Sequence, residues 1–151
     1  MTNKRTGVFV CHCGSNIAGT VDVAKVAEAM AGEETVVCSQ DYVYMCSDPG
    51  QNTVIQAIKD KQLDSVVISC CSPNLHEKTF RDNAKAAGLN SLTCEIANIR
   101  EQCAWVHKDR DQATEKAIKI SRSAIRRVAR NQPLDPIEVG VGVVWVSCLK
   151  F

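Results

Sequence analysis

The chain has 151 residues, of which 45% are hydrophobic and 23% charged, the proportions of an ordinary soluble globular domain. Its formal net charge of +1 gives no overall electrostatic reason to bind nucleic acid or an anionic membrane. Its nine cysteines are an odd number, so complete internal disulfide pairing is excluded. No segment approaches the roughly 18 apolar residues of a membrane span, and no apolar run of signal-peptide length opens the chain. We therefore expect a cytoplasmic protein whose thiols are free for metal or redox chemistry.

Short apolar, β-branched runs alternate with longer segments of helical periodicity. The runs that predict strands are residues 7–11, 35–38, 65–69 and 92–96. The segments that predict helices are 22–31, 48–62 and 72–88, opened by Asp22, Asp48-Pro49 and Ser72-Pro73. This alternation predicts an α/β fold, a Rossmann-like three-layer domain around a four-stranded, mainly parallel sheet.

A long C-terminal helix is predicted from Arg100 to about Arg130, with Val106 at the start of its apolar stripe. Its other face is basic and is interpreted first as a solvated surface, with a docking surface for an acidic partner as the alternative. The residues of that face are Lys116, Lys119, Arg122, Arg126, Arg127 and Arg130. Pro133 and Pro136 cannot continue a helix, so we expect a domain over 1–132 and a linker and tail over 133–151. The run at 137–146 resembles one further strand.

Six cysteines are predicted to lie at one edge of this sheet. Cys11 and Cys13 follow the first strand, Cys70 and Cys71 the third, Cys46 precedes a helix, and Cys103 comes one helical turn after the fourth strand. The carboxyl ends of parallel strands form the functional edge of such folds, so these thiols are candidates for chemistry. Cys38 and Cys94 lie inside strands and are predicted to be small buried hydrophobes, whereas Cys148 in the tail has no interpretation.

The cysteine spacing contains no Cys-x-x-Cys pair, which excludes the zinc-ribbon, thioredoxin and ferredoxin patterns. Ligands dispersed over four loops favour an iron–sulfur cluster over structural zinc. Of Cys70 and Cys71, Cys71 is the better candidate ligand because it lies at the start of a helix, where amide hydrogens stabilise a thiolate. The same argument favours Cys46, which also precedes a helix. Cys11 and Cys13, expected on one side of an extended segment, remain equal alternatives.

Four segments of the chain form a pattern that is specific in order and content. They are Phe9-Val-Cys-His-Cys-Gly-Ser-Asn-Ile-Ala-Gly19, Cys46-Ser-Asp-Pro-Gly-Gln51, Cys71-Ser-Pro-Asn-Leu-His-Glu-Lys-Thr-Phe-Arg81 and Asn98-Ile-Arg-Glu-Gln-Cys-Ala-Trp-Val-His107. Together they resemble the amino-terminal domain of the A subunit of heterodisulfide reductase, over about residues 5 to 135. The related flavoprotein of the quinone-interacting membrane-bound oxidoreductase complex shares that family.

The resemblance implies an electron-transfer domain with a [4Fe-4S] cluster, which serves an oxidoreductase of anaerobic metabolism as a component rather than a complete catalyst. The cysteines that match are Cys11, Cys13, Cys46, Cys71 and Cys103, five candidates for four places. The implied partners are flavoprotein and iron–sulfur subunits of a redox complex, and ferredoxin. FAD is implied only for the full-length family, because the chain after Pro136 lacks the Gly-x-Gly-x-x-Gly turn of a flavin-binding strand.

Two alternatives of other classes stand beside the electron relay. One is a metal-free thiol redox domain, in which Cys11 and Cys13, or Cys70 and Cys71, cycle to a disulfide or persulfide. The other is a non-catalytic module whose basic helix docks a partner flavoprotein.

Overall fold

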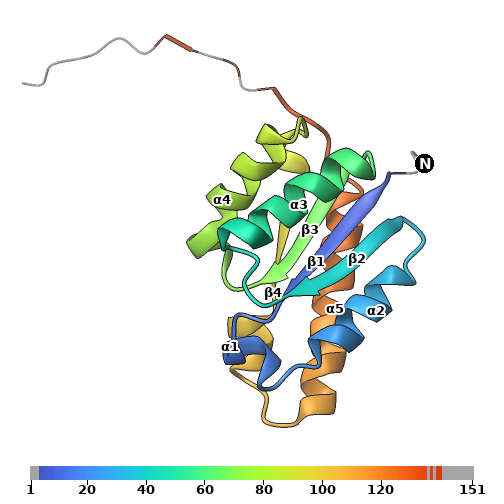
Figure 1. The fold of residues 1–151 in the computed structure, drawn as a ribbon, viewed down its shortest axis with the longest axis vertical. Helices are drawn as coiled ribbons and strands as arrows, with labels where there is room; N and C mark the ends of the chain where they lie inside the picture. The colour runs from blue at the N-terminus through green and yellow to red at the C-terminus, as the bar shows by residue number, and fades with distance from the viewer. Residues whose placement is uncertain (1–3, 136, 138, 141–151) are drawn as a thin grey trace, which may run out of the picture.

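The computed structural model describes residues 4–135, 137, 139 and 140, and it contains a four-stranded parallel sheet with helices on both faces (Figure 1). The strand order is β2-β1-β3-β4, and every neighbouring pair is parallel. The strands are β1 Thr6–Cys11, β2 Val36–Tyr42, β3 Ser65–Cys70 and β4 Cys94–Asn98. The predicted Rossmann-like α/β fold is confirmed. Cys148 and most of the run at 137–146 lie outside the described residues.

The helices form two layers, one on each face of the sheet. One layer holds α1 Ser15–Ala18, α2 Val23–Ala31 and α5 Arg110–Val128, and the other holds α3 Asp48–Asp60 and α4 Pro73–Ala86. A 3₁₀ turn, η1 Ser91–Thr93, leads into β4, and a π-helical turn, η2 Arg100–Ala104, follows it. No described helix is long and apolar enough to cross a membrane.

Alternate side chains of the central strands fill two separate apolar cores. Val8, Val10 and Val67 pack with α2 and α5, whereas Phe9 and Ile68 pack with α3 and α4. Burial on both faces explains why the strands read as continuous apolar runs rather than alternating ones. The same alternation puts the thiols that end β1 and β3 on the face of α3 and α4.

The predicted long C-terminal helix is confirmed as α5, but its predicted start at Arg100 is wrong, because the segment is divided. The turn η2 ends at Ala104, and α5 begins afresh at Arg110. The Asp109 carboxylate accepts a hydrogen bond from the Gln112 N–H at 2.8 Å and so caps the new helix start. Val106, predicted for the apolar stripe, lies in the connection and is 67% exposed.

Two other local predictions can be compared with the structure. The α3 N-cap is Ser47, whose hydroxyl accepts from the Gly50 N–H at 3.4 Å, so Asp48 is the first helical residue and not the cap. The basic face of α5 is exposed at Arg126, while Arg122 and Arg127 form ion pairs with Glu33 and Glu95. These contacts tie α5 to the α2–β2 turn and to β4.

Candidate metal centre

The candidate site lies where the strand order reverses, at the carboxyl edge between β1 and β3. In doubly wound sheets this switch point opens a crevice because the connections leave in opposite directions. β1 ends there with Cys11 and β3 with Cys70. The loop after β2 joins the same edge, since the Met45 N–H donates to the Cys11 sulfur at 3.4 Å and the His12 N–H to the Tyr42 carbonyl at 2.9 Å.

Cys11 is buried, and its sulfur accepts two backbone hydrogen bonds. The donors are the N–H groups of Cys13, at 3.3 Å, and of Met45, at 3.4 Å. Burial raises the pKa of Cys11 to about 11 in spite of these bonds. The two amides are nevertheless oriented to stabilise negative charge on this sulfur.

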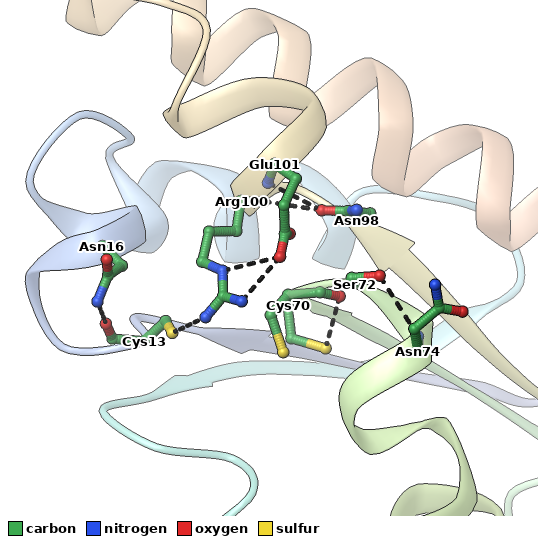
Figure 2. A network of polar contacts seen from close by, with 9 residues as sticks. Cys13, Asn16, Cys70, Ser72, Asn74, Asn98, Arg100 and Glu101 are labelled. Carbon is green, nitrogen blue, oxygen red and sulfur yellow. Dashed lines mark hydrogen bonds and ion pairs between the residues drawn. The ribbon is translucent and has the colours of Figure 1, made fainter.

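Cys13 departs from the expectation of an extended segment. Its φ is 49°, in the left-handed region, and Gly14 follows with a φ of 56°. The reversal turns the Cys13 thiol to a side of the loop where the Arg100 Nη1 donates to its sulfur at 3.2 Å (Figure 2). The thiols of Cys11 and Cys13 therefore reach this edge of the sheet by different means, one at a strand end and one in a left-handed turn.

Cys46 and Cys71 each directly precede the N-cap of a helix, as predicted. The caps are Ser47 for α3 and Ser72 for α4. Both thiols thus stand at the positive end of a helix dipole, a position that favours a thiolate. The loop of Cys46 is held by Gln51, whose amide donates to the Cys46 carbonyl at 2.8 Å.

The pKa values of these two thiols differ. Burial raises the pKa of Cys46. In contrast, the adjacent Cys70 thiol, together with the charge of the Arg100 guanidinium, outweighs burial and lowers the pKa of Cys71 to about 7. Cys71 is therefore expected to lose its proton more readily than Cys11 or Cys46.

A charged group that was not expected from the sequence completes the edge (Figure 2). The Arg100 Nε and Nη2 donate to the Glu101 Oε1 at 3.1 and 2.7 Å, and the guanidinium lies 4.9 Å from the centre of the Trp105 ring. The Asn98 side-chain oxygen accepts from the backbone N–H groups of both charged residues. The adjacent pair of opposite charges directly after a strand end is the sequence feature that could have indicated it.

The structure does not bring Cys103 to the other candidates. Its thiol donates to the Ala113 carbonyl at 3.0 Å and is buried in the core that α2 and α5 share. The turn η2 separates the two side chains, because it directs Arg100 to the edge and Cys103 to α5.

Cys70 ends β3 beside Cys71, whereas the other two cysteines, Cys38 and Cys94, lie away from the edge. Cys70 is buried beside Cys71 and donates to its carbonyl at 3.6 Å. Cys94 is fully buried in the α3–α4 core, as predicted, and burial raises its pKa to about 12. Cys38, on the edge strand β2, is half-buried.

The histidines of this region make hydrogen bonds within the protein. The His12 Nε2 lies 2.6 Å from the Asp41 carboxylate, and the His107 Nδ1 lies 2.8 Å from the Cys103 carbonyl. Within residues 4–135, 137, 139 and 140, no three cysteine, histidine, aspartate or glutamate side chains are placed to hold a single metal ion.

The sequence was compared with those of known proteins and known families. No family model matches the chain. It is 49% identical over 138 residues to the iron-sulfur A 2 subunit of the CoB–CoM heterodisulfide reductase of Methanopyrus kandleri, with coverage of 91% of this chain and 21% of that relative. It is 52% identical over 125 residues to the A subunit of the Ferredoxin/F(420)H(2)-dependent CoB-CoM heterodisulfide reductase of Methanosarcina acetivorans, covering 82% of this chain and 16% of the relative.

A third relative extends the match along nearly the whole described domain. The A subunit of the H(2):CoB-CoM heterodisulfide,ferredoxin reductase of Methanothermobacter thermautotrophicus is 47% identical over 142 residues, 93% of this chain and 22% of its own length. The chain thus spans about a fifth of the length of the curated relatives that it matches. Along that fifth, the chain is homologous to the A subunits of heterodisulfide reductases.

Proposed function

We propose that this chain is an electron-transfer domain in which Cys11, Cys13, Cys46 and Cys71 hold a [4Fe-4S] cluster that exchanges single electrons with a flavoprotein module. The observation that carries the proposal is the convergence of these thiols at the switch point of the sheet. They come from the loops after β1, β2 and β3. Cys103, the fifth cysteine that the family resemblance implies, is left out because its thiol is committed to the opposite core.

The donor chemistry of the four residues fits such a cluster. Iron–sulfur clusters take four thiolates and are tuned by hydrogen bonds to sulfur and by solvent exposure. Here backbone amides serve Cys11, the Arg100 guanidinium serves Cys13, and helix N-termini lie beside Cys46 and Cys71. When bound, the cluster would supply one-electron chemistry without making or breaking a bond to substrate. The protein's part is to bind the cluster, shield it and set its charge environment.

The partner assignment rests on the relatives. Their names place the A subunit in heterodisulfide reductases, and two of them also name ferredoxin. We infer a place in a complex with flavoprotein and iron–sulfur subunits, with ferredoxin as a further redox partner. FAD is assigned to the flavoprotein module, and substrate chemistry to other parts of the complex.

Anaerobic reconstitution with iron and sulfide tests the proposal. The expected result is the iron and sulfide content of one [4Fe-4S] cluster, about four of each per chain. An EPR signal is expected after reduction with dithionite. Serine at any one of Cys11, Cys13, Cys46 or Cys71 is expected to lower the iron content and to change that signal.

The matched controls are Cys38→Ser and Cys103→Ser, since both remove a thiol from outside the edge. Both are expected to retain the full iron content. If Cys103→Ser loses the cluster and one of the four edge variants keeps it, Cys103 is a ligand in place of the cysteine changed in that variant. A wild-type chain that takes up zinc but no iron and sulfide would refute the cluster.

A second candidate, metal-free thiol redox chemistry, is favoured by one specific contact. The Cys70 thiol adjoins Cys71, whose pKa is lowered to about 7, and a thiolate of this kind attacks disulfides at neutral pH. It predicts that oxidation removes thiols two at a time and that Cys71→Ser prevents the loss. Thiol titration of the metal-free chain under graded oxidant separates this candidate from the electron relay.

A further inference from the structure

The most distinctive charged contact of the domain joins Arg100 to the thiol edge. Its Nη1 donates to the Cys13 sulfur at 3.2 Å, and its charge also acts on Cys71 and Cys46. One guanidinium thus influences three of the four thiols proposed as ligands. It comes from η2, an element that supplies none of those thiols.

The guanidinium is held in a fixed orientation by its other neighbours. The Arg100 side chain is only 14% exposed. Two of its nitrogens face the Glu101 carboxylate, its plane lies over the Trp105 ring, and Asn98 anchors the backbone of the turn. A long side chain that makes this many contacts loses conformational freedom on folding, which favours a role that depends on its position.

The Arg100–Glu101 ion pair is oriented with its positive group toward Cys13. The nitrogen on Cys13 and those on Glu101 belong to different edges of the same planar group, so the cation stands between the sulfur and the carboxylate. The thiol therefore meets the positive end of a largely desolvated dipole. Electrostatic effects of this kind are stronger near a protein interior than in water.

We propose that Arg100 is a positioning residue that raises the reduction potential of the metal centre at Cys13. The inference rests on the proposed function, because it concerns the same four thiols. Reduction adds one electron, supplied in the test by dithionite, and no bond forms or breaks. The site gains one negative charge, which the adjacent guanidinium stabilises more in the reduced than in the oxidised form.

The test is an EPR-monitored redox titration of the reconstituted chain and three variants. Arg100→Gln removes the charge and keeps a polar but shorter side chain, so the potential of this variant is expected to fall. A tenfold weaker preference for the reduced form corresponds to about 59 mV for one electron, and a fall of this size or more is expected. Arg100→Lys keeps the charge without the planar fork and should recover most of the shift. Arg127→Gln removes an ion-paired arginine that contacts Glu95 on β4 and should leave the potential unchanged.

Iron content is measured on the same samples to separate this role from a structural one. If Arg100→Gln holds full iron at the wild-type potential, the inference is overturned and the cluster assignment stands. If that variant loads poorly, Glu101→Gln decides, because removal of the anion must shift the potential in the positive direction and no shift overturns the inference. A wild-type chain that binds no iron overturns the proposed function and this inference together.

Discussion

Cys71 and Cys94 are both buried, at 5% and 0% exposure, and both adjoin strands of the same sheet. Their thiols differ in their neighbours. Cys71 lies between a strand end and a helix start, near the Cys70 thiol and the Arg100 guanidinium, and its pKa is about 7. Cys94 lies inside the apolar core, where burial raises its pKa to about 12. Burial therefore does not separate reactive thiols from structural ones in this domain, whereas the polar groups around each sulfur do.

The largest expected difference between these two regions is in ionisation. In the metal-free chain at pH 7, about half of Cys71 should be thiolate, against about one part in 10⁵ of Cys94 with its pKa of about 12. A lowered pKa means that the thiolate appears as pH rises through 7. Ultraviolet thiolate absorbance followed with pH should show one group with a midpoint near 7 that Cys71→Ala abolishes. A midpoint that stays in this variant would contradict the assignment.

Gly50→Ala should displace the loop that carries Cys46 without changing any cysteine. A Cβ at Gly50 would lie 2.4 Å from the Tyr44 carbonyl oxygen and 2.6 Å from the Met45 Cα, so the loop of Cys46 must move. We expect a loss of about 3 kcal/mol in the free energy of unfolding and a lower iron content after reconstitution. Gly32→Ala is the control, since its nearest neighbour would be at 3.6 Å, and it should change stability by less than about 0.5 kcal/mol. Denaturant unfolding of both variants measures the difference.

Cys94→Ser tests whether the buried core cysteine contributes to stability rather than to iron binding. A serine hydroxyl at this fully buried position is expected to cost about 2 kcal/mol of unfolding free energy, because the apolar core offers it poor solvation. Cys94→Ala, which adds no polar group, should cost less. Both variants should bind iron as the wild type does after reconstitution. Iron loss in either, without unfolding, would show that the body of the sheet contributes to the centre.

Much of the fold could be predicted from the sequence because buried parallel strands and capped helices have strong local patterns. The ends of two strands differ from the prediction because their tertiary surroundings, rather than their local sequence, determine them. β2 extends to Tyr42 through Ser39 and Gln40, beyond the predicted end at 38, because an edge strand tolerates polar residues. Thr93, predicted to lie in a strand, is in the turn η1, which Asn90 caps. The break before Arg110 was missed because the periodicity continues across it.

The candidate site was predictable to the level of the sheet edge, and no further. Strand-end topology indicates which loops converge, and it predicts six cysteines at this edge, of which the structure places Cys103 in the opposite core. The direction of a side chain in an irregular turn depends on backbone angles that the sequence does not reveal. The π-helical turn η2 reversed the expectation for Cys103 and brought Arg100 to the thiols instead.

The order of the strands has a consequence for how this centre assembles. Cys13, Cys46 and Cys71 reach the edge only after β1 has paired with both β2 and β3, partners that are distant in the chain. Closing such long loops is entropically costly, so no short peptide from this chain presents the full set of thiols. In a zinc finger, neighbouring ligands let the metal direct folding. Here the proposed ligands meet only in the paired sheet, so metal uptake is expected to report on completed folding rather than to initiate it.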